Sequence, residues 1–354
     1  MKGKRETRDR MGKIAVIGVY GVGEDFTTGQ AVKCHTVIDW FIQKYGVDQV
    51  KIVNTYQWKK TPLKLLSALF AAFRSCSNII LMPAQNGIKV FAPLCYILNR
   101  IYKRKIHYIV IGGWLAEMLS QHHILKEIIA AFSGVYVEAV SMEEKLEKLG
   151  LNNVHYMPNS RDYTAREKKE NIGEIPLSVC TYSRVVKQKG IADAVEICRR
   201  ANKKCGTNIF HLDIYGKIAE EFKQELDILL KKNVEIVDYV GCKDADETIN
   251  VLDNYFALLF PTYYEGEGFA GTILDAFAAE IPVIANDWKY NAEIIKNGIN
   301  GMIYPYRDLE VASDKLVELY KNPELYKRIQ NECKKSALQY STARVMREFE
   351  KNLC

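Results

Sequence analysis

The sequence predicts an α/β protein whose two halves each form a doubly wound parallel sheet. Along the 354 residues, short β-branched runs alternate with amphipathic helical segments, and the alternation restarts in the second half. Alternating strands and helices favour parallel strands joined by crossover helices. The length exceeds that of one typical domain and suits two. Two such halves would leave a cleft between them, which is a favoured place for a ligand.

The first half supplies six strand-like runs and three clear helical segments. Strands are expected at 13–18, 50–54, 78–83, 106–112, 133–140 and 153–160, and helices at 29–45, 63–74 and 141–150. Ser141 followed three residues later by Glu144 is a capping-box pattern. It predicts that the Ser141 side chain caps the third helix.

A charged segment poor in core residues, 162–174, is expected to link the halves. After it, strands are expected at 177–183, 208–216, 234–241, 256–262 and 281–287. Helices are expected at 190–204, 218–232, near 244–253, at 270–280, and at roughly 308–320, 323–338 and 341–352. The strand at 256–262, the acidic glycine loop after it and the next helix form one βαβ unit. Open α/β sheets bind ligands at such carboxyl ends of strands.

Composition favours a soluble cytoplasmic protein. The content is 48% hydrophobic and 26% charged, and the nine cysteines are scattered without a CxxC pair, which indicates reduced thiols. The polar start lacks the apolar region of a signal peptide, and no apolar run reaches the roughly 18 residues of a membrane span. Residues 1–10 are expected to be a disordered tail or to precede the true start at Met11.

Positive charge is concentrated in the first half. Residues 1–170 hold 25 Lys and Arg against 15 Asp and Glu. Such an excess suggests an anionic partner, although a solvated basic surface is an alternative. The sequence has neither an aromatic–basic RNP signature nor zinc-finger spacing, so no nucleic-acid partner is expected.

Several common enzyme motifs are absent. There is no GxxxxGK[ST], GxSxG or HExxH motif, and the neighbours His122 and His123 would point to different faces of a regular element. The loop with Gly18, Gly21 and Gly23 reads GxxGxG, not GxGxxG, so it is a weak dinucleotide signal.

Two cations beside a predicted helix start suit a diphosphate. In TYSRVVKQKGIADAV (181–195), Arg184 and Lys189 flank a turn, and Gly190 permits a tight entry into the helix. Arginine supplies a planar fork, lysine supplies a point charge, and the helix dipole adds to both. The alternative is a pair of solvated surface cations.

Two carboxylates follow in the second half. Glu267 lies in EGEGF just before a helix, where it could accept hydrogen bonds from first-turn N–H groups or from a bound polyol. Asp275, about two helical turns on, lies near the same face and could chelate a vicinal diol such as a ribose. The alternative makes Glu267 a helix cap and Asp275 a satisfied, partly buried carboxylate.

Together, these motifs resemble the retaining glycosyltransferases of family 4. SRVVKQKG resembles the diphosphate site of that family, EGFAGTILD its Glu-x7-Glu motif, and NGINGMIYP its NGxNGxxxP segment. The resemblance covers about 178–306 closely and the first half only in layout. It implies the GT-B fold, with two Rossmann-like doubly wound domains facing across a cleft. Residues 1–170 would then bind the acceptor, 171–338 would bind the nucleotide sugar, and 339–354 would form a helix packing back toward the first domain.

The resemblance also assigns roles to residues. Glu267 would hold the sugar hydroxyls and support an oxocarbenium-like state, Arg184 and Lys189 would stabilise the leaving diphosphate, and Asp275 would hold the ribose. No metal or other cofactor would be required, and the one D-x-D, Asp244–Asp246, is not expected to bind metal. Further donor-binding positions would be Gly268, Phe269, Ala270, Gly216 and Gly241. The acceptor-side loop would contain Gly21, Gly23, Gly113 and Trp114.

Two departures from the family pattern affect this assignment. Asp275 stands where the family has glutamate, so its carboxylate is set back by about 1.5 Å, one C–C bond. The histidine often found near the sugar in the first domain is not identifiable, and Trp114 lies in the stretch where it would be expected.

The predicted activity is that of a retaining, hexosyltransferase-type enzyme that moves a sugar from a nucleotide-diphosphate sugar to a glycan acceptor. Similarity to polysaccharide and O-antigen transferases favours a lipid-linked, polyprenyl-type acceptor. Segments 61–74 and 90–107 combine apolar helices with cations and suit peripheral binding to the anionic inner face of a membrane, although they could instead be core helices with charged ends. The cations are Lys60, Lys64, Arg74, Arg100, Lys103, Arg104 and Lys105.

Two other functions remain open at this point. One is a sugar-nucleotide epimerase, or another GT-B enzyme acting on the same donors, which would need no acceptor. The other is a non-catalytic nucleotide-sugar-binding scaffold, against which the presence of Arg184, Lys189 and Glu267 argues. The sequence does not indicate the oligomeric state or the donor.

Overall fold

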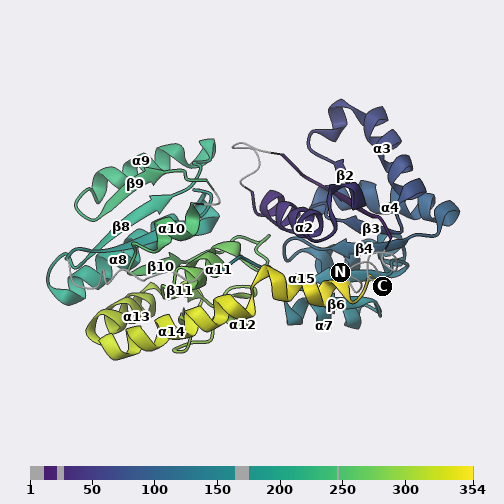
Figure 1. Cartoon of the computed structure of the whole chain (residues 1–354). Helices are drawn as coiled ribbons and strands as arrows, with labels where there is room; N and C mark the ends of the chain where they lie inside the picture. The colour runs from purple at the N-terminus through teal and green to yellow at the C-terminus, as the bar shows by residue number, and fades with distance from the viewer. Residues whose placement is uncertain (1–11, 22–27, 164–174, 245–246, 354) are drawn as a thin grey trace. The chain divides into compact units, whose positions relative to one another are not determined.

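The structure, a computed structural model, describes residues 12–21, 28–163, 175–244 and 247–353. Gly23, Asp246, residues 1–10 and most of the predicted linker lie outside these ranges. The chain divides into two compact units (Figure 1). Unit 1 comprises residues 1–160 together with 342–354, and unit 2 comprises residues 161–341.

Unit 1 is built on a six-stranded sheet in the order β2-β1-β3-β4-β5-β6, with every pairing parallel. The strands are β1 Ile14–Gly18, β2 Val50–Asn54, β3 Asn78–Leu81, β4 Lys105–Ile109, β5 Gly134–Val137 and β6 Val154–Tyr156. In the register, Ile14 lies opposite Val50 on one side and Asn78 on the other. The central strands are buried throughout, as expected for a sheet covered on both faces.

The helices of unit 1 follow the strands in alternation. They are α2 Gly29–Tyr45, α3 Pro62–Ser75, α4 Gln85–Tyr102, α5 Leu115–Gln121, α6 His123–Ala130, α7 Val140–Lys148 and α15 Thr342–Glu350. Short 3-10 turns occur at Val47–Gln49 and Trp58–Lys60. Right-handed crossovers place α2 on one face of the sheet and α3 to α7 on the other, because the chain reverses its direction across the sheet after β2.

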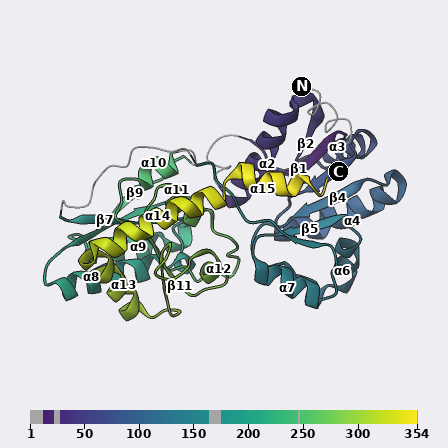
Figure 2. The same cartoon turned by 60° about the horizontal axis from the view of Figure 1, so that its bottom comes forward.

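The last helix belongs to unit 1. α15 packs beside α2 (Figure 2), and Phe349, 2% exposed, lies 4.7 Å from the ring of Tyr136 in an edge contact. Glu350 accepts hydrogen bonds from Trp40 Nε1 at 2.9 Å and is ion-paired with Lys44. Residues far apart in sequence therefore complete one core on this face of the sheet.

Unit 2 repeats the architecture with the strand order β12-β11-β10-β7-β8-β9, again parallel throughout. Its strands are β7 Leu177–Tyr182, β8 Phe210–Tyr215, β9 Val237–Gly241, β10 Ala257–Phe260, β11 Val283–Asn286 and β12 Met302–Tyr304. Its helices are α8 Ile191–Cys205, α9 Lys223–Lys232, α10 Thr248–Leu252, α11 Gly271–Ala278, α12 Asn291–Ile294, α13 Leu309–Lys321 and α14 Pro323–Gln339. 3-10 turns lie at Lys187–Lys189 and Glu220–Phe222.

The predicted α/β class and the alternation of strands and helices are confirmed. The predicted capping box is wrong: α7 begins at Val140 with Ala139 as its N-cap, and no side chain caps it. Ser141 is therefore already inside the first turn, where its backbone is helical and its side chain cannot serve as the cap. The helix expected at 218–232 starts with a 3-10 turn, and the one near 244–253 is regular only from Thr248 to Leu252.

Two further observations concern thiols and membrane spans. Of the nine cysteines, the eight within the described ranges are free thiols, most of them buried. Within the same ranges, no helix is both long and apolar enough to cross a bilayer.

We expect Phe349→Ala to destabilise unit 1 by about 3–5 kcal/mol, the usual cost of deleting a fully buried aromatic side chain. Urea unfolding followed by tryptophan fluorescence measures this, because Trp40, Trp58 and Trp114 all lie in unit 1. The same change at Phe70, whose side chain is 44% exposed, is the matched control and should shift the midpoint far less. Equal shifts in the two variants would show that α15 does not contribute to the core of unit 1.

Candidate functional site

The predicted catalytic pair Lys189 and Glu267 meets at the carboxyl edge of the unit 2 sheet. Lys189 follows β7 and Glu267 follows β10, and these two strands are neighbours. Lys189 Nζ lies 2.6 Å from Glu267 Oε2, and the two side chains are 11% and 9% exposed. Thr262 Oγ1 donates to the same oxygen at 2.9 Å. One carboxylate oxygen is thus held by a cation and a hydroxyl in a largely desolvated position, where charge-assisted hydrogen bonds are strong.

Gly190 makes this contact possible. It adopts φ 72° as the N-cap of α8, directly after the 3-10 turn that ends at Lys189. A Cβ at Gly190 would lie 2.2 Å from the carbonyl oxygen of Pro261, at the end of β10. Only glycine therefore lets the lysine turn approach the strand that leads to Glu267.

Arg184 and Lys189 share one aromatic neighbour that the sequence interpretation did not single out. The Arg184 guanidinium carbon and Lys189 Nζ each lie 5.3 Å from the ring centroid of Tyr264. Trp288 Nε1 donates to the Tyr264 carbonyl at 3.0 Å and fixes the loop that carries it. The signal was present in the sequence as the aromatic pair immediately before EGEGF, since a ring beside two cations stabilises both.

The glycines predicted on the donor side gather near Arg184. The Gly216 N–H donates to the Gly241 carbonyl at 2.9 Å. Gly216 has φ 128°, and a Cβ there would lie 1.7 Å from the carbonyl oxygen of Ser183. The ends of β8 and β9 therefore approach the residue that precedes Arg184, leaving backbone rather than side chains at this edge.

The loop Gly268, Phe269 and Ala270 leads into α11. Phe269 is 4% exposed and makes an edge contact with Tyr340 at 5.1 Å between centroids. Ala270 is the N-cap without a side-chain hydrogen bond, and the first turn carries no acidic residue. The positive end of α11 is therefore not neutralised by its own side chains, which suits an anionic group beside Glu267.

Asp275 lies in the middle of α11 and is paired with Arg161, which the sequence interpretation missed. Arg161 Nε lies 2.6 Å from Asp275 Oδ1, and their side chains are 19% and 10% exposed. Burial raises the pKa of Asp275, while the Arg161 charge and hydrogen bond hold that rise down. Gly271 makes room for the arginine, because a Cβ there would lie 2.0 Å from its Nη2. No sequence pattern signalled Arg161, which sits at the start of unit 2.

In unit 1, the described residues among those predicted for the acceptor-side loop lie near the carboxyl ends of β1 and β4. The Gly21 N–H donates to His35 Nε2 at 3.2 Å, and His35 stacks on Tyr20 at 4.5 Å between centroids. Gly113 precedes Trp114, the N-cap of α5. The Trp114 indole is 8% exposed and donates to the Ile111 carbonyl at 2.8 Å, so it is directed at its own backbone.

A buried ion pair at this edge was also missed by sequence reasoning. Lys33 Nζ lies 2.5 Å from Glu138 Oε1, with both side chains 5% exposed or less. Glu138 Oε2 also accepts from the Gly112 N–H at 3.3 Å. The sequence signal was an acidic residue directly after the buried strand β5, since buried charges require partners.

Within the described ranges, one group of side chains has metal-ligand spacing: His211, Asp213 and Asp238. It lies on β8 and β9, and its members already contact one another, with His211 Nε2 3.1 Å from Asp238 Oδ2. Asp213 accepts from the Tyr255 hydroxyl at 2.6 Å. These contacts with one another and with Tyr255 explain why the three side chains lie together. Asp244 lies in a loop next to residues outside the described ranges.

We expect Arg161→Ala to destabilise unit 2 by about 3 kcal/mol at pH 8, because it leaves a buried carboxylate without its cation. The pKa of Asp275 is already raised and should rise further in the variant. A carboxyl group with a raised folded-state pKa costs stability as pH rises through that pKa. The difference between parent and variant in free energy of unfolding should therefore grow from pH 4 to pH 8, as measured by urea unfolding.

The matched control is the double variant Arg161→Ala, Asp275→Asn, which has no charge at either position. Its stability relative to the parent should change with pH in the opposite sense or not at all above pH 5. A single variant equally destabilised at pH 4 and pH 8 would show that the pair acts through packing and not through charge.

Comparison with known proteins finds similarity to glycosyltransferases, mostly in unit 2. Residues 162–336 match the family model "Glycosyl transferases group 1". The putative glycosyltransferase EpsD of Bacillus subtilis is 32% identical over 130 residues, covering 37% of this chain and 33% of EpsD. The capsular polysaccharide biosynthesis glycosyltransferase CapM of Staphylococcus aureus is 28% identical over 169 residues, covering 47% of this chain and 43% of CapM. The chain thus spans less than half the length of these curated relatives.

Solved structures resemble nearly the whole chain. HepE of Anabaena in complex with UDP has a TM-score of 0.75 at 14% identity, covering 96% of this chain and 99% of HepE. The lipopolysaccharide outer core galactosyltransferase WaaB in its apo form has a TM-score of 0.69 at 15% identity, with the same two coverages. At these identities the likeness concerns the fold. The chain has the α/β fold of these GT-B structures, and its residues 162–336 are similar to the group 1 glycosyl transferases.

Proposed function

We propose that the protein is a glycosyltransferase that moves a sugar from a nucleotide-diphosphate sugar to a glycan acceptor, with retention of anomeric configuration. The observation that carries this proposal is the contact of Lys189 with Glu267 beside the uncapped start of α11. It brings a phosphate-binding cation and a buried carboxylate to one point, as a reaction that expels a diphosphate beside a sugar ring requires. The family match of residues 162–336 supports the same reaction class.

Departure of the nucleoside diphosphate develops negative charge, and this site offers three groups to stabilise it. These are the Arg184 guanidinium, the Lys189 ammonium and the first-turn N–H groups of α11. Preorganised donors of this kind act strongly in a desolvated site, because they need no reorganisation as charge develops. In the ligand-free protein, Glu267 neutralises Lys189, so a bound diphosphate would share that cation with the carboxylate.

Glu267 would act on the sugar. Because Lys189 and Thr262 both contact Oε2, the carboxylate is held in one orientation rather than free to move. An oriented anion next to the anomeric carbon favours an oxocarbenium-like state and can accept hydrogen bonds from sugar hydroxyls. Asp275 would bind the ribose through Oδ2, since Arg161 already occupies Oδ1.

The acceptor is proposed to be a lipid-linked glycan. Relatives named for capsular polysaccharide and amylovoran biosynthesis support a growing glycan as the acceptor class. The basic first half supports an anionic lipid carrier. Gly21, Gly113 and their neighbours in unit 1 would form the acceptor side.

We expect Lys189→Ala to lower turnover about 10²–10³-fold, the loss typical of removing one preorganised charge stabiliser. Arg184→Ala should fall in the same range. A panel of nucleotide-diphosphate sugars, screened by thermal shift, identifies the donor, and release of nucleoside diphosphate in the presence of acceptor then measures turnover. Stabilisation of the parent by a donor, together with acceptor-dependent turnover, separates a transferase from an epimerase and from a scaffold.

Lys187→Ala is the matched control, because this lysine lies two residues earlier, has a side chain that is 68% exposed and pairs with surface Glu225. Its turnover should stay within about twofold of the parent, as surface pairs contribute little. Parent-like turnover in the Lys189 and Arg184 variants, with unchanged melting temperatures, would remove both cations from the site.

We expect turnover to persist in excess EDTA. The cations and backbone N–H groups at the site carry the charge that a metal would otherwise neutralise, so the proposed mechanism has no step for a metal. Turnover is measured after dialysis against EDTA, with and without added Mg²⁺ or Mn²⁺. Loss of activity that returns only with a divalent cation would contradict the metal-free mechanism, and His211→Ala would then test the cluster on β8.

A further inference from the structure

Exposed apolar side chains of unit 1 are concentrated on one layer of helices. Ten large hydrophobic residues are exposed among the described residues of unit 1, and seven of them lie on α3, α4 and α6. α3 packs against α4, and α4 packs against α6, so the outer sides of the three helices adjoin. We call this surface the docking face. Its apolar residues are Leu63, Leu66 and Phe70 on α3, Val90, Ile97 and Ile101 on α4, and Ile124 on α6.

These residues are surplus to the core. α3 turns a separate set of side chains inward, namely Leu65, Leu69 and Phe73, which are at most 7% exposed. By contrast, Leu63 is 83% exposed and Ile101 is 71% exposed. The helices are therefore apolar on two sides, and the outer apolar side has no partner among the described residues of unit 1. A concentration of this kind marks an interaction surface.

The charge on α3 and α4 has one sign, whereas α6 carries the exposed Glu127, which is paired with Lys126. Residues 49–116 contain ten Lys and Arg and no Asp or Glu. Eight of these cations are exposed. One is Lys105 in β4, and the other seven lie on or next to α3 and α4: Lys59, Lys60, Lys64, Arg74, Lys89, Arg100 and Lys103. Cations around the exposed apolar side chains of α3 and α4 suit an anionic bilayer.

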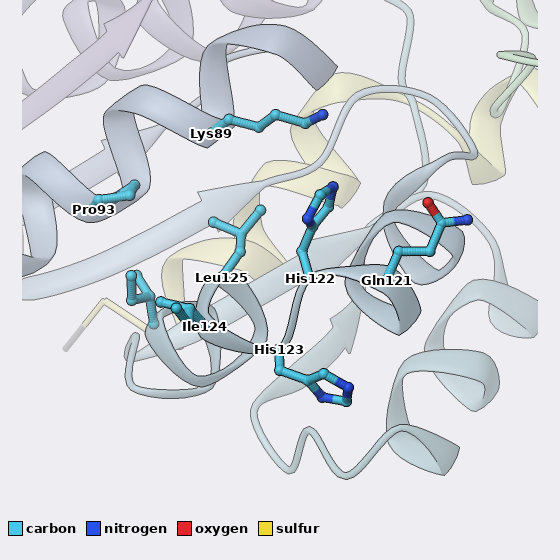
Figure 3. A pocket seen from close by; sticks show the side chains of 8 residues that line it. Lys89, Pro93, Gln121, His122, His123, Ile124 and Leu125 are labelled. Carbon is cyan, nitrogen blue, oxygen red and sulfur yellow. The ribbon is translucent and has the colours of Figure 1, made fainter.

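A pocket opens on the same layer between α4 and α6. Its volume is about 500 Å³, and its apolar lining includes Pro93, Ile124 and Ile128. The polar side of the lining carries Lys89 and His122, which extend toward one another, while His123 points away (Figure 3). An apolar hollow with hydrogen-bond donors on one side has the chemistry needed for a lipid phosphate and the first part of its chain.

The structure changes which cations are available for such contact. Arg104, expected from the sequence to face the membrane, instead donates from Nε to the Phe73 carbonyl at 2.8 Å and from Nη2 to the Arg74 carbonyl at 3.3 Å. It therefore closes the carboxyl end of α3. Lys105 lies in β4 and donates to the Leu353 carbonyl at 3.4 Å. The predicted cations Lys64 and Arg100 are exposed on the docking face, and the structure adds Lys89 to them.

We propose that the docking face binds an anionic lipid bilayer, with Leu63, Phe70 and Ile101 entering the interfacial region and the surrounding cations contacting lipid phosphates. Lys89 and His122 hold one headgroup phosphate at the mouth of the α4–α6 pocket. The apolar side chains supply burial and the cations supply long-range attraction, and neither alone gives stable anchoring. The lipid-linked acceptor proposed above gives this binding its purpose, but the binding itself requires neither donor nor sugar transfer.

Co-sedimentation with vesicles tests the proposal, using phosphatidylcholine with and without 30% phosphatidylglycerol and no donor. The parent should bind the anionic vesicles, and its binding should weaken at high salt without disappearing. A triple variant should bind about a hundredfold more weakly, because each cation near such a surface contributes about 1 kcal/mol. This charge variant combines Lys64→Ser, Lys89→Ser and Arg100→Ser. A second triple variant, the apolar variant, should lose the binding that persists at high salt. It combines Leu63→Ser, Phe70→Ser and Ile101→Ser.

Matched controls carry the same changes in unit 2, at exposed positions of similar chemistry. The charge control is a double variant that combines Lys231→Ser and Lys232→Ser. The apolar control is a double variant that combines Ile228→Ser and Val234→Ser. Both should bind as the parent does, and all variants should keep the parent melting temperature. A parent that ignores anionic vesicles, or docking-face variants that bind as tightly as the controls, would overturn the proposal. A parent dimer that the apolar variant converts to monomer would assign the face to a protein contact instead.

Transferase assays keep this inference separate from the proposed function. With a short soluble acceptor, the docking-face variants should turn over as the parent does, since none of the changed residues lies at the donor site. Loss of vesicle binding with retained soluble activity supports the docking face. Retained vesicle binding without transferase activity would refute the proposed function and leave the docking face standing.

Discussion

Charge that is buried at the carboxyl ends of parallel strands is the constraint on which both units depend. A parallel sheet brings all its carboxyl ends to one edge, and loops there carry polar residues into partly desolvated positions. Each buried charge then needs a partner, or its desolvation costs several kcal/mol. Unit 1 meets this requirement with Lys33 and Glu138, and unit 2 meets it with Lys189 and Glu267 and with Arg161 and Asp275.

These pairs differ in what else holds them. The Lys33–Glu138 pair also takes a backbone N–H of Gly112, so it closes the edge of its own sheet. The Lys189–Glu267 pair instead rests on a turn that glycine alone permits and is flanked by the Tyr264 ring and the start of α11. An anion arriving there finds a cation whose present partner is one carboxylate oxygen. Lys189 is therefore placed to exchange its carboxylate partner for an incoming anion, whereas the Lys33–Glu138 pair is placed to stay intact.

Much of the fold, and the loops that carry Lys189 and Glu267, could be predicted from the sequence, because the patterns that indicate them are local. β-branched runs and helical periodicity identified the strands and helices, and glycines next to charged residues identified the turn at Gly190 and the loop at Glu267. The features that the sequence did not predict are contacts between residues far apart in the chain. Arg161 lies 114 positions from Asp275, and Glu350 lies 310 positions from Trp40, so no local pattern announces either partnership. Ser141 shows the opposite failure, since a local motif was present but the helix began one residue earlier.

The Arg161–Asp275 pair also bears on the shortened acidic residue of the family motif. A glutamate would carry its carboxylate about 1.5 Å farther from the helix than aspartate does. Aspartate keeps the carboxylate close to α11, where the guanidinium fits only because Gly271 has no side chain. The short acid, the arginine and the glycine therefore form one arrangement, and changing any of them alone would leave either a clash or an unpaired charge. That arrangement adds a third cation beside the positive end of α11, so Arg184, Lys189 and Arg161 face the two carboxylates Glu267 and Asp275 at the proposed donor site. The excess of one positive charge favours an anionic ligand there.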